Sequence, residues 1–178
     1  MSIEENLLAS GKPCIEICAL QDRTFRNFYK FTVVSILIRD ALEMDISAIS
    51  SQITGLGYPT TPKQMEVRFR TIAGKPDYKT IIADIEGKAV GLVGACIGYY
   101  YEHDGTYLRV LALVTCATAR NNGIASALLS AIEEWGVKQG ASSVVLNSGN
   151  RKEREAAHSF YLRRGFEAKS VGFVKTLP

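Results

Sequence analysis

The hydrophobic period of the chain changes near residue 120, and this change restricts the fold more than any other feature of the sequence. Thr106–Thr115 is rich in leucine and valine and predicts a strand. Beyond a short polar loop, apolar residues recur with the spacing of one helix face, at Ile124, Leu128, Ala131, Ile132 and Trp135. Ser143–Leu146 then predicts a short apolar strand. This strand, helix, strand order predicts a crossover between strands of one sheet.

Two further strands are predicted just upstream, over Thr80–Ile85 and Ala89–Tyr101. The turns Glu86-Gly87-Lys88 and His103-Asp104-Gly105 would connect the three strands, and Asp-Gly tolerates positive φ. Consecutive strands joined by tight turns predict an antiparallel meander. Together with the crossover, this predicts an α/β fold. Its central sheet would be mixed and mostly antiparallel, with about six to seven strands and about four flanking helices.

Two helices are predicted before the meander. The first spans Ile46 to Leu56, with Asp45 at its N-cap position, and Glu43 and Asp45 would be helix-start charges. The second begins at Thr61-Pro62-Lys63-Gln64, which combines an N-cap threonine, a first-position proline and a third-position glutamine. That pattern is typical of a capping box. Gly74 would end the second helix.

The remaining segments set the domain boundaries. Ile36–Ile38 predicts the first strand, Ala156–Tyr161 a helix, and Phe166–Leu177 a closing strand. We therefore expect one domain over residues 36–178, because 178 residues suit a single sizeable core. Residues 1–35 are expected to be an N-terminal extension of open role, with a short amphipathic helix within Leu20–Phe31. A homodimer formed through this extension stays open.

Composition excludes several classes of protein. The net charge is +3, from 21 basic and 18 acidic residues, without the concentrated basic face of nucleic-acid binders. No apolar run reaches the roughly 18 residues that span a membrane, and the N-terminus is acidic where a signal peptide is basic. Four scattered cysteines and two histidines predict small buried thiols and no metal site. The expectation is a cytoplasmic protein without a membrane or nucleic-acid partner.

The loop between the crossover strand and its helix is the strongest candidate for a functional site. Free backbone amides at a helix N-terminus attract phosphate oxygens, Arg120 adds a charge, and the small residues Gly123 and Ala125 permit close approach. A tight turn with a surface arginine is the alternative. No P-loop sequence occurs. Gly91, Gly94 and Gly98 lie within a strand, so a bulge or close packing is expected of them rather than a dinucleotide fingerprint.

Several motifs resemble one known family. Arg120-Asn121-Asn122-Gly123-Ile124-Ala125 resembles the Arg/Gln-x-x-Gly-x-Gly/Ala motif of the GCN5-related N-acetyltransferase (GNAT) superfamily. The second motif of that family is similar in order and spacing to Ser148-Gly149-Asn150-Arg151, Ala157-His158-Ser159-Phe160-Tyr161 and Arg164-Gly165-Phe166. A bacterial branch that includes small-molecule amine acetyltransferases is similar at Leu56-Gly57-Tyr58-Pro59, Val90-Gly91 and Phe173–Leu177. The resemblance covers about residues 36–178.

The resemblance implies a GNAT fold that binds acetyl-CoA between two splayed strands. It assigns pantetheine pairing to the backbone of Leu113, Val114 and Thr115, and an oxyanion-stabilising N–H near Val114. The pyrophosphate would lie on the loop and helix start, at Arg120, Asn121, Asn122, Gly123, Ile124, Ala125 and Ser126. Asn150 would contact the cofactor, or would simply lie in a turn. Tyr161 matches the general acid that protonates the CoA thiolate, and with a reference pKa near 10 it can donate at neutral pH.

The general base is left open. Many relatives carry a glutamate where this sequence has Ala112, which cannot accept a proton. Glu102, His103, Asp104 and water chains along Tyr99 or Tyr107 are alternatives. Tyr58 and Tyr99 are the candidates for substrate contact.

The function predicted on this basis is direct transfer of an acetyl group from acetyl-CoA to a primary amine, within a ternary complex. A small-molecule amine is favoured over a protein amino group as the acceptor. No covalent intermediate is implied, and Cys116 is expected to pack rather than react. The alternative is an acyl-CoA sensor or partner-binding module that has the fold without turnover, and Ala112 keeps this alternative open.

Overall fold

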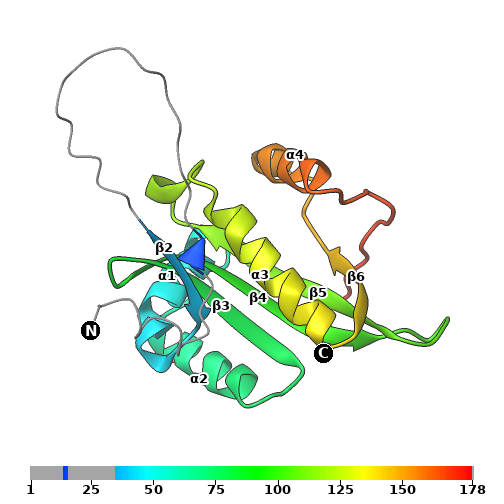
Figure 1. Ribbon diagram of the computed structural model, residues 1–178, viewed down its shortest axis with the longest axis horizontal. Coiled ribbons are helices and arrows are strands. Elements are labelled where there is room, and N and C mark those ends of the chain that lie inside the picture. Colours follow the sequence, from blue (N-terminus) through cyan, green and yellow to red (C-terminus); the bar gives the residue numbers. More distant parts are fainter. Residues whose placement is uncertain (1–13, 16–34, 178) are drawn as a thin grey trace, which may run out of the picture.

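The computed structural model describes residues 14–15 and 35–177 (Figure 1). For residues 14 and 15 it describes the backbone alone. The helix predicted within Leu20–Phe31 and nearly all of the predicted extension over residues 1–35 lie outside the described residues.

Within the described residues, six strands form one sheet in the order β1-β2-β3-β4-β5-β6. The strands are β1 (Cys14–Ile15), β2 (Ile36–Asp40), β3 (Tyr78–Ile85), β4 (Lys88–Tyr99), β5 (Thr106–Thr115) and β6 (Ala141–Leu146). The four α-helices are α1 (Ile46–Gly55), α2 (Pro62–Ala73), α3 (Ile124–Lys138) and α4 (Glu155–Arg163). Neighbouring strands are antiparallel except β5 and β6, which are parallel and joined through α3. The predicted α/β fold with a mixed, mostly antiparallel sheet is confirmed.

The meander forms as its turn residues predict. Glu86 and Gly87 both have positive φ, 51° and 78°, and they connect β3 to β4. β5 has the predicted bounds, and a longer loop that ends at Gly105 joins it to β4. At the start of α2, the Thr61 side chain accepts a hydrogen bond from the Gln64 backbone N–H, and Gln64 Oε1 accepts one from the Thr61 N–H at 3.0 Å. The predicted capping box is therefore present.

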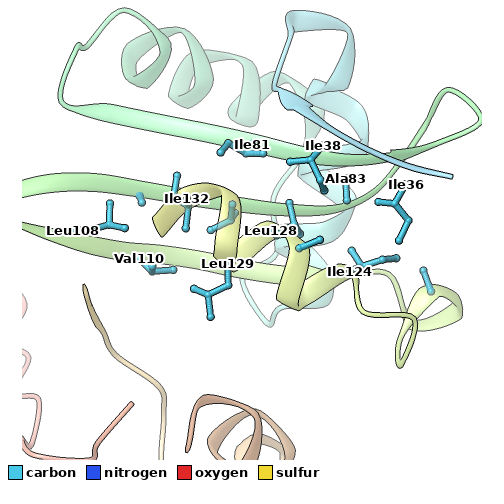
Figure 2. Close-up of a cluster of buried hydrophobic side chains, with 14 of the residues drawn as sticks. Ile36, Ile38, Ile81, Ala83, Leu108, Val110, Ile124, Leu128, Leu129 and Ile132 are labelled. Carbon is cyan, nitrogen blue, oxygen red and sulfur yellow. The ribbon is translucent and has the colours of Figure 1, made fainter. Parts of the chain in front are cut away.

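The sheet separates two apolar cores, because successive side chains on a strand point to opposite faces. On β3, Ile81 and Ala83 belong to the larger core with α3, whereas Ile82 packs with α1 and α2 on the other face. Figure 2 shows the larger core, with side chains of α3 such as Leu128 lying against the strands. Helices on both faces hold the central strands in place around the crossover.

Asp45 differs from its predicted role. It stands at the N-cap position of α1, but its carboxylate makes no cap hydrogen bond to that helix. Instead it is buried, accepts from the Leu42 N–H at 2.8 Å, and pairs with both terminal nitrogens of Arg39 at 2.7 and 2.8 Å. Arg39 also reaches buried Asp84 on β3 at 2.8 Å. The carboxylate thus joins α1 to the sheet, because a buried carboxylate is stabilised more by a guanidinium partner than by a single cap hydrogen bond.

The predicted closing strand over Phe166–Leu177 is wrong. The structure describes these residues without a strand, and Phe173 and Val174 are almost fully exposed. The alternating apolar residues of this segment fit a pleated surface, but strand formation also needs a partner with free backbone groups. Here the segment has no ladder with β6 or with any other described strand.

Candidate active site

A β-bulge in β5 is the structural origin of the site. Ala95 pairs with Val110 and Gly94 pairs with Ala112, so Leu111 has no partner in β4. The extra residue reverses which side chains face which core. Val110 lies in the core with α3, whereas Ala112 packs against the core with α1 and α2, although two-residue spacing would keep them on one face. The predicted role of Gly94 at a bulge fits this register.

β5 loses its β6 partner at the same place. The parallel ladder between the two strands ends at Val110 and Leu146, so Leu111–Thr115 has β4 on one edge and none of the described strands on the other. The Cys116 N–H donates to Val90 O at 2.8 Å, which means that the backbone groups of Val114 also face β4. The amides and carbonyls of Leu113 and Thr115 therefore face the free edge. Leu113 and Thr115, rather than Val114, carry the amides that a ligand at this edge can reach.

The loop after β5 delivers unpaired amides to the same end of the strand. Gly123 is the N-cap of α3 and has φ 74°, and Asn121 also has a positive φ of 64°. No side chain caps this helix, so the first amides of α3, at Ile124, Ala125 and Ser126, lack intrahelical partners. Arg120 is exposed beside them. This is the geometry of an anion site at the positive end of a helix dipole.

Gly91 allows α3 to start this close to the sheet. A Cβ added at Gly91 would lie 3.0 Å from Ile124 Cγ2 and 3.1 Å from Val114 O. Gly91 thus has the close-packing role expected of it, and so does Gly98, whose Cβ would overlap the ring of Tyr107.

A cleft of about 140 Å³ opens where β5 and β6 separate. Its walls come from the loop between α1 and α2, the ends of β5 and β6, and the start of α4. The lining residues are Leu56, Tyr58, Val110, Leu111, Ala112, Leu113, Leu146, Asn147, Ser148, Gly149, Arg151, Arg154, Ala157 and Tyr161. The cleft brings together Tyr58, Ala112, Leu113 and Tyr161, which are far apart in the sequence.

Tyr161 is the half-buried phenol of this cleft. Its ring packs edge-on against Phe160 and Phe166, with centroids 5.5 and 5.7 Å away. Burial raises the pKa of the Tyr161 hydroxyl above its usual value, and the Arg154 charge opposes part of that rise. The hydroxyl therefore stays protonated at neutral pH and can donate a proton.

Arg154 and Arg151 belong to the cleft, although sequence reasoning did not assign them to it. Arg154 Nη2 donates to the Leu56 carbonyl at 2.6 Å and so connects the start of α4 to the loop between α1 and α2. One signal could have found Arg154. It precedes Ala157 by three residues and Tyr161 by seven, the spacing of one helix face. Asn150 is exposed and does not line the cleft, although its neighbours Gly149 and Arg151 do.

Tyr99 and the candidate bases are not brought to the cleft. Tyr99 pairs with Thr106 at the far end of the β4–β5 ladder and is 75% exposed. Thr106 and Leu113 are seven residues apart on β5, roughly 23 Å at the rise of a strand. Glu102, His103 and Asp104 are exposed in that distant loop.

Tyr107 lies at the same distant end of the ladder, opposite Gly98. The placements of these residues support neither a base nor a substrate contact, because hydrogen-bond reach to the cleft is needed for both roles. The identity of a base is thus not resolved by the candidates that the sequence offered.

Cys116 lies at the end of β5 beside a buried amide. Gln52 of α1 donates from Nε2 to Ala89 O at 2.8 Å, and the same nitrogen lies 3.8 Å from Cys116 Sγ. Gln52 was not singled out in the sequence, and its contacts fix the chain where the loop begins. A neutral amide does not activate a thiol, which agrees with the packing role predicted for Cys116.

The described residues hold neither a cluster of metal ligands nor a helix that could span a membrane. Residues 35–177 contain no group of three or more His, Cys, Asp or Glu side chains placed to hold a metal ion. Among the helices of the same range, none is both long and apolar enough to span a bilayer.

The chain belongs to the acetyltransferase (GNAT) family, whose model matches residues 45–166. The matched segment includes α1 to α4, the bulge, the loop before α3 and the cleft. The resemblance noted in the sequence is therefore confirmed, and its motifs lie on the elements that form the site.

Individual relatives agree with the family. A curated protein, "Uncharacterized N-acetyltransferase YhdJ" of Bacillus subtilis (strain 168), is 38% identical over 74 residues, which are 41% of this chain and 51% of the relative. The chain thus spans about half the length of that curated relative. A GNAT family acetyltransferase of Staphylococcus aureus has a similar structure, with a TM-score of 0.68 and 29% identity over 80% of this chain and 98% of that one.

The fold alone is shared with an aminoglycoside N-acetyltransferase, AAC(6')-Iy, solved in complex with CoA. The TM-score is 0.67 and the identity 19%, over 79% of this chain and 94% of that one.

Proposed function

We propose that this protein is an acetyl-CoA-dependent N-acetyltransferase that transfers the acetyl group directly to a primary amine of a small molecule. The observation that carries this proposal is the end of the β5–β6 ladder at Val110 and Leu146. It leaves a free strand edge and a protonated tyrosine at one cleft, and the free edge runs on toward the loop before the N-terminus of α3. These three features match the three parts of the reaction: cofactor amides, cofactor phosphates and thiolate leaving group.

Acetyl-CoA fits the chain at two places. Its pantetheine amides can add to the free edge of β5 through the backbone of Leu113 and Thr115, as an extended peptide adds to a sheet. Its pyrophosphate can accept from the amides of residues 120–126, where the small side chains of Gly123 and Ala125 leave the backbone open. Both interactions use backbone groups, so they position the donor without depending on flexible side chains.

The chemistry is a single displacement. The neutral amine nitrogen attacks the thioester carbonyl carbon, a C–N bond forms, and the C–S bond breaks as the oxyanion collapses. An amide of the free edge stabilises that oxyanion, and Tyr161 gives its proton to the departing CoA thiolate. The attacking nitrogen, which is positively charged once the C–N bond has formed, releases a proton to water, and the Tyr161 phenolate regains a proton from water after each turnover. The lining of the described cleft has neither a carboxylate nor an imidazole, so water takes the proton that the ammonium form of the acceptor must lose.

An acyl-CoA sensor without turnover is the second candidate, and the presence of Ala112 in the cleft favours it. A sensor needs the binding features alone, whereas an enzyme also needs its acid. Replacing Tyr161 therefore separates the two functions. A protein amino group is the remaining alternative acceptor, and it would have to reach the same cleft.

Calorimetric titration with acetyl-CoA tests the cofactor site. We expect micromolar binding by the native chain and at least about tenfold weaker binding by Arg120→Ala, because a charge-assisted hydrogen bond to phosphate contributes roughly 1.5–3 kcal/mol. Arg163→Ala is the matched control, since Arg163 is an exposed arginine of α4 outside the cleft. Absence of binding at millimolar acetyl-CoA by folded protein would contradict the proposal.

The Tyr161→Phe variant tests turnover. Loss of a general acid lowers kcat by about 10²- to 10⁴-fold, while the Kd for acetyl-CoA stays within about twofold. The assay follows release of the CoA thiol with a panel of amines. Unchanged kcat in Tyr161→Phe would remove the tyrosine from the mechanism, and CoA binding without thiol release from any amine would favour the sensor.

A further inference from the structure

We propose that the acceptor amine also carries an oxyanion group, a phosphate, phosphonate or carboxylate, and that Arg154 and Arg151 bind that group. This inference rests on the proposed function and specifies its substrate class. It excludes polycationic acceptors such as aminoglycosides.

The charge of the cleft is the first argument. Arg151 and Arg154 are the charged residues of its described lining, and no acidic residue accompanies them there. Two like charges at one end of a partly desolvated cleft raise the local concentration of anions and repel cations. An acceptor with several ammonium groups would meet uncompensated repulsion at this site.

The second argument is that the described residues offer the two guanidinium groups no carboxylate partner. Within the described residues, neither arginine forms an ion pair. Their acidic neighbours in sequence, Glu153 and Glu155, are exposed and do not line the cleft. Structural arginines of this protein behave differently: Arg39 has two carboxylate partners. The charges of the cleft are thus available to a ligand.

Arg154 is also held in position. It is half-buried, and its Nη2 donates to Leu56 O at 2.6 Å. A guanidinium has five N–H donors in a planar fork, so this contact orients the group and leaves other donors for an oxyanion. Its charge reaches Tyr161, whose pKa it lowers in opposition to burial. Arg154 and Tyr161 both line the same cleft, so an acceptor held by the arginine lies in the cleft that holds the proton donor.

The CoA phosphates have a separate site. None of residues 120–126, which offer the amides at the start of α3, lines the cleft that Arg151 and Arg154 line. The cleft itself extends to Leu56 and Tyr58 of the α1–α2 loop, which lies on the sheet face opposite α3. The two arginines are thus associated with the acceptor side of the transfer.

The test uses ethanolamine and O-phosphoethanolamine, which differ only in the phosphate. Each is titrated calorimetrically into the protein saturated with CoA, so that binding is measured without turnover. We expect O-phosphoethanolamine to bind at least about tenfold more tightly than ethanolamine, because charge-assisted hydrogen bonds contribute that much or more. β-Alanine distinguishes a carboxylate from a phosphate, and kanamycin represents the polycations. Equal binding of the matched pair, or preference for kanamycin, would overturn the inference.

The variants Arg151→Gln and Arg154→Gln assign the effect to these side chains. We expect each to reduce the preference for O-phosphoethanolamine over ethanolamine by about tenfold, with the Kd for acetyl-CoA unchanged. Arg163→Gln, on the exposed surface of α4, should leave the preference intact. If the arginines had a purely structural role, the variants would bind both amines more weakly by the same factor. If the arginines bound the cofactor, the variants would bind acetyl-CoA more weakly. Either result contradicts the inference.

Thiol release from acetyl-CoA, followed in separate samples with the same amines and variants, reports on the proposed function independently. Selective binding without transfer would leave the anion site standing and remove the acetyltransferase activity with these amines. Transfer of the acetyl group without selective binding of O-phosphoethanolamine would support the acetyltransferase activity and contradict the anion site.

Discussion

The two halves of β5 differ in their strand partners and in their burial. Thr106–Val110 and Leu111–Thr115 both pair with β4, but only the first half pairs with β6. In the first half Leu108 is fully buried, whereas Leu111 at the start of the second is 51% exposed. A single unpaired residue therefore divides one strand into a part that builds the core and a part whose backbone has a free edge.

The first half, Thr106–Val110, which we call the closed half, pairs with strands on both edges and packs against α3 on one face; Leu111–Thr115 is called the open half. The Tyr100 hydroxyl forms a hydrogen bond with Ser143 of β6, and the close approach of Gly136 in α3 to Leu108 leaves no room for a Cβ. The open half has α3 and the α1–α2 loop around it, with its β6 edge unpaired. Packing of the core thus depends mainly on the closed half of β5, and the proposed binding of acetyl-CoA depends on the open half. Mutations in the two halves should therefore affect stability and binding separately.

The largest expected effect is a loss of stability when a leucine in one half of β5 is truncated, compared with the same change in the other half. Leu108→Ala should lower the free energy of unfolding by about 2–5 kcal/mol, because it removes a fully buried side chain and leaves a cavity. Leu111→Ala should cost less than about 1 kcal/mol, because half of that side chain is already in water. Urea denaturation of both variants measures the difference. Equal losses would mean that the halves are not distinct in packing.

A smaller effect is expected from two glycines of β4, Gly91 and Gly94, which pair with Thr115 and Ala112 in the second half of β5. Gly91→Ala places a methyl group 3.0 Å from Ile124 Cγ2 and 3.1 Å from Val114 O. Displacing the start of α3 should cost about 1–3 kcal/mol and weaken acetyl-CoA binding.

Gly94→Ala is the control for this prediction, since nothing lies within 4 Å of the added methyl group. Its stability and its acetyl-CoA affinity should both stay near native. Calorimetry and denaturation are applied to both variants. A Gly91→Ala protein with native affinity would show that the spacing of α3 from the sheet does not shape the cofactor site.

The smallest of the expected effects is the loss of stability at low pH, which arises from the Arg39–Asp45 pair outside β5. Arg39 lowers the pKa of Asp45 below the value of about 3.9 that an aspartate has in an unfolded chain. As pH falls, the unfolded chain takes up the proton first. The stabilisation by this pair is therefore complete above about pH 5, and it is lost as pH falls toward the folded-state pKa.

Denaturation between pH 3 and pH 7 measures the loss, and Asp45→Asn should flatten the profile. The affinity of the folded protein for acetyl-CoA should not change with the titration of any protein carboxylate, because the described cleft lining has none. A parallel decline of affinity and stability would contradict the separation of the two halves.

The sequence predicted what short-range patterns determine. The bounds of β5, the capping box of Thr61 and Gln64 and the amphipathic face of α3 all depend on residues within a few positions of each other. The helix-start site after β5 was predicted for the same reason, because its glycine and its arginine lie next to the helix.

Pairing between distant segments explains the errors. Asp45 was expected to cap α1, but the position of Arg39 on an adjacent strand decides its role. Tyr99 stays an untested prediction as a substrate contact, and the register of β4 with β5 places it opposite Thr106, away from the cleft. The strand predicted over Phe166–Leu177 failed because its propensity is local whereas its partner is not. Arg154 was missed because its importance comes from the cleft it faces.

The unpaired edge of β5 also has a consequence for self-association. A free strand edge is a template on which another chain can add, and long flat edges lead to aggregation. In this protein the free stretch is the five residues Leu111–Thr115, which begin at a bulge and lead into the loop before α3. Such an edge is too short and too twisted to recruit a further strand of a growing sheet. The interruption that exposes backbone to a ligand therefore also protects that backbone from other copies of the chain.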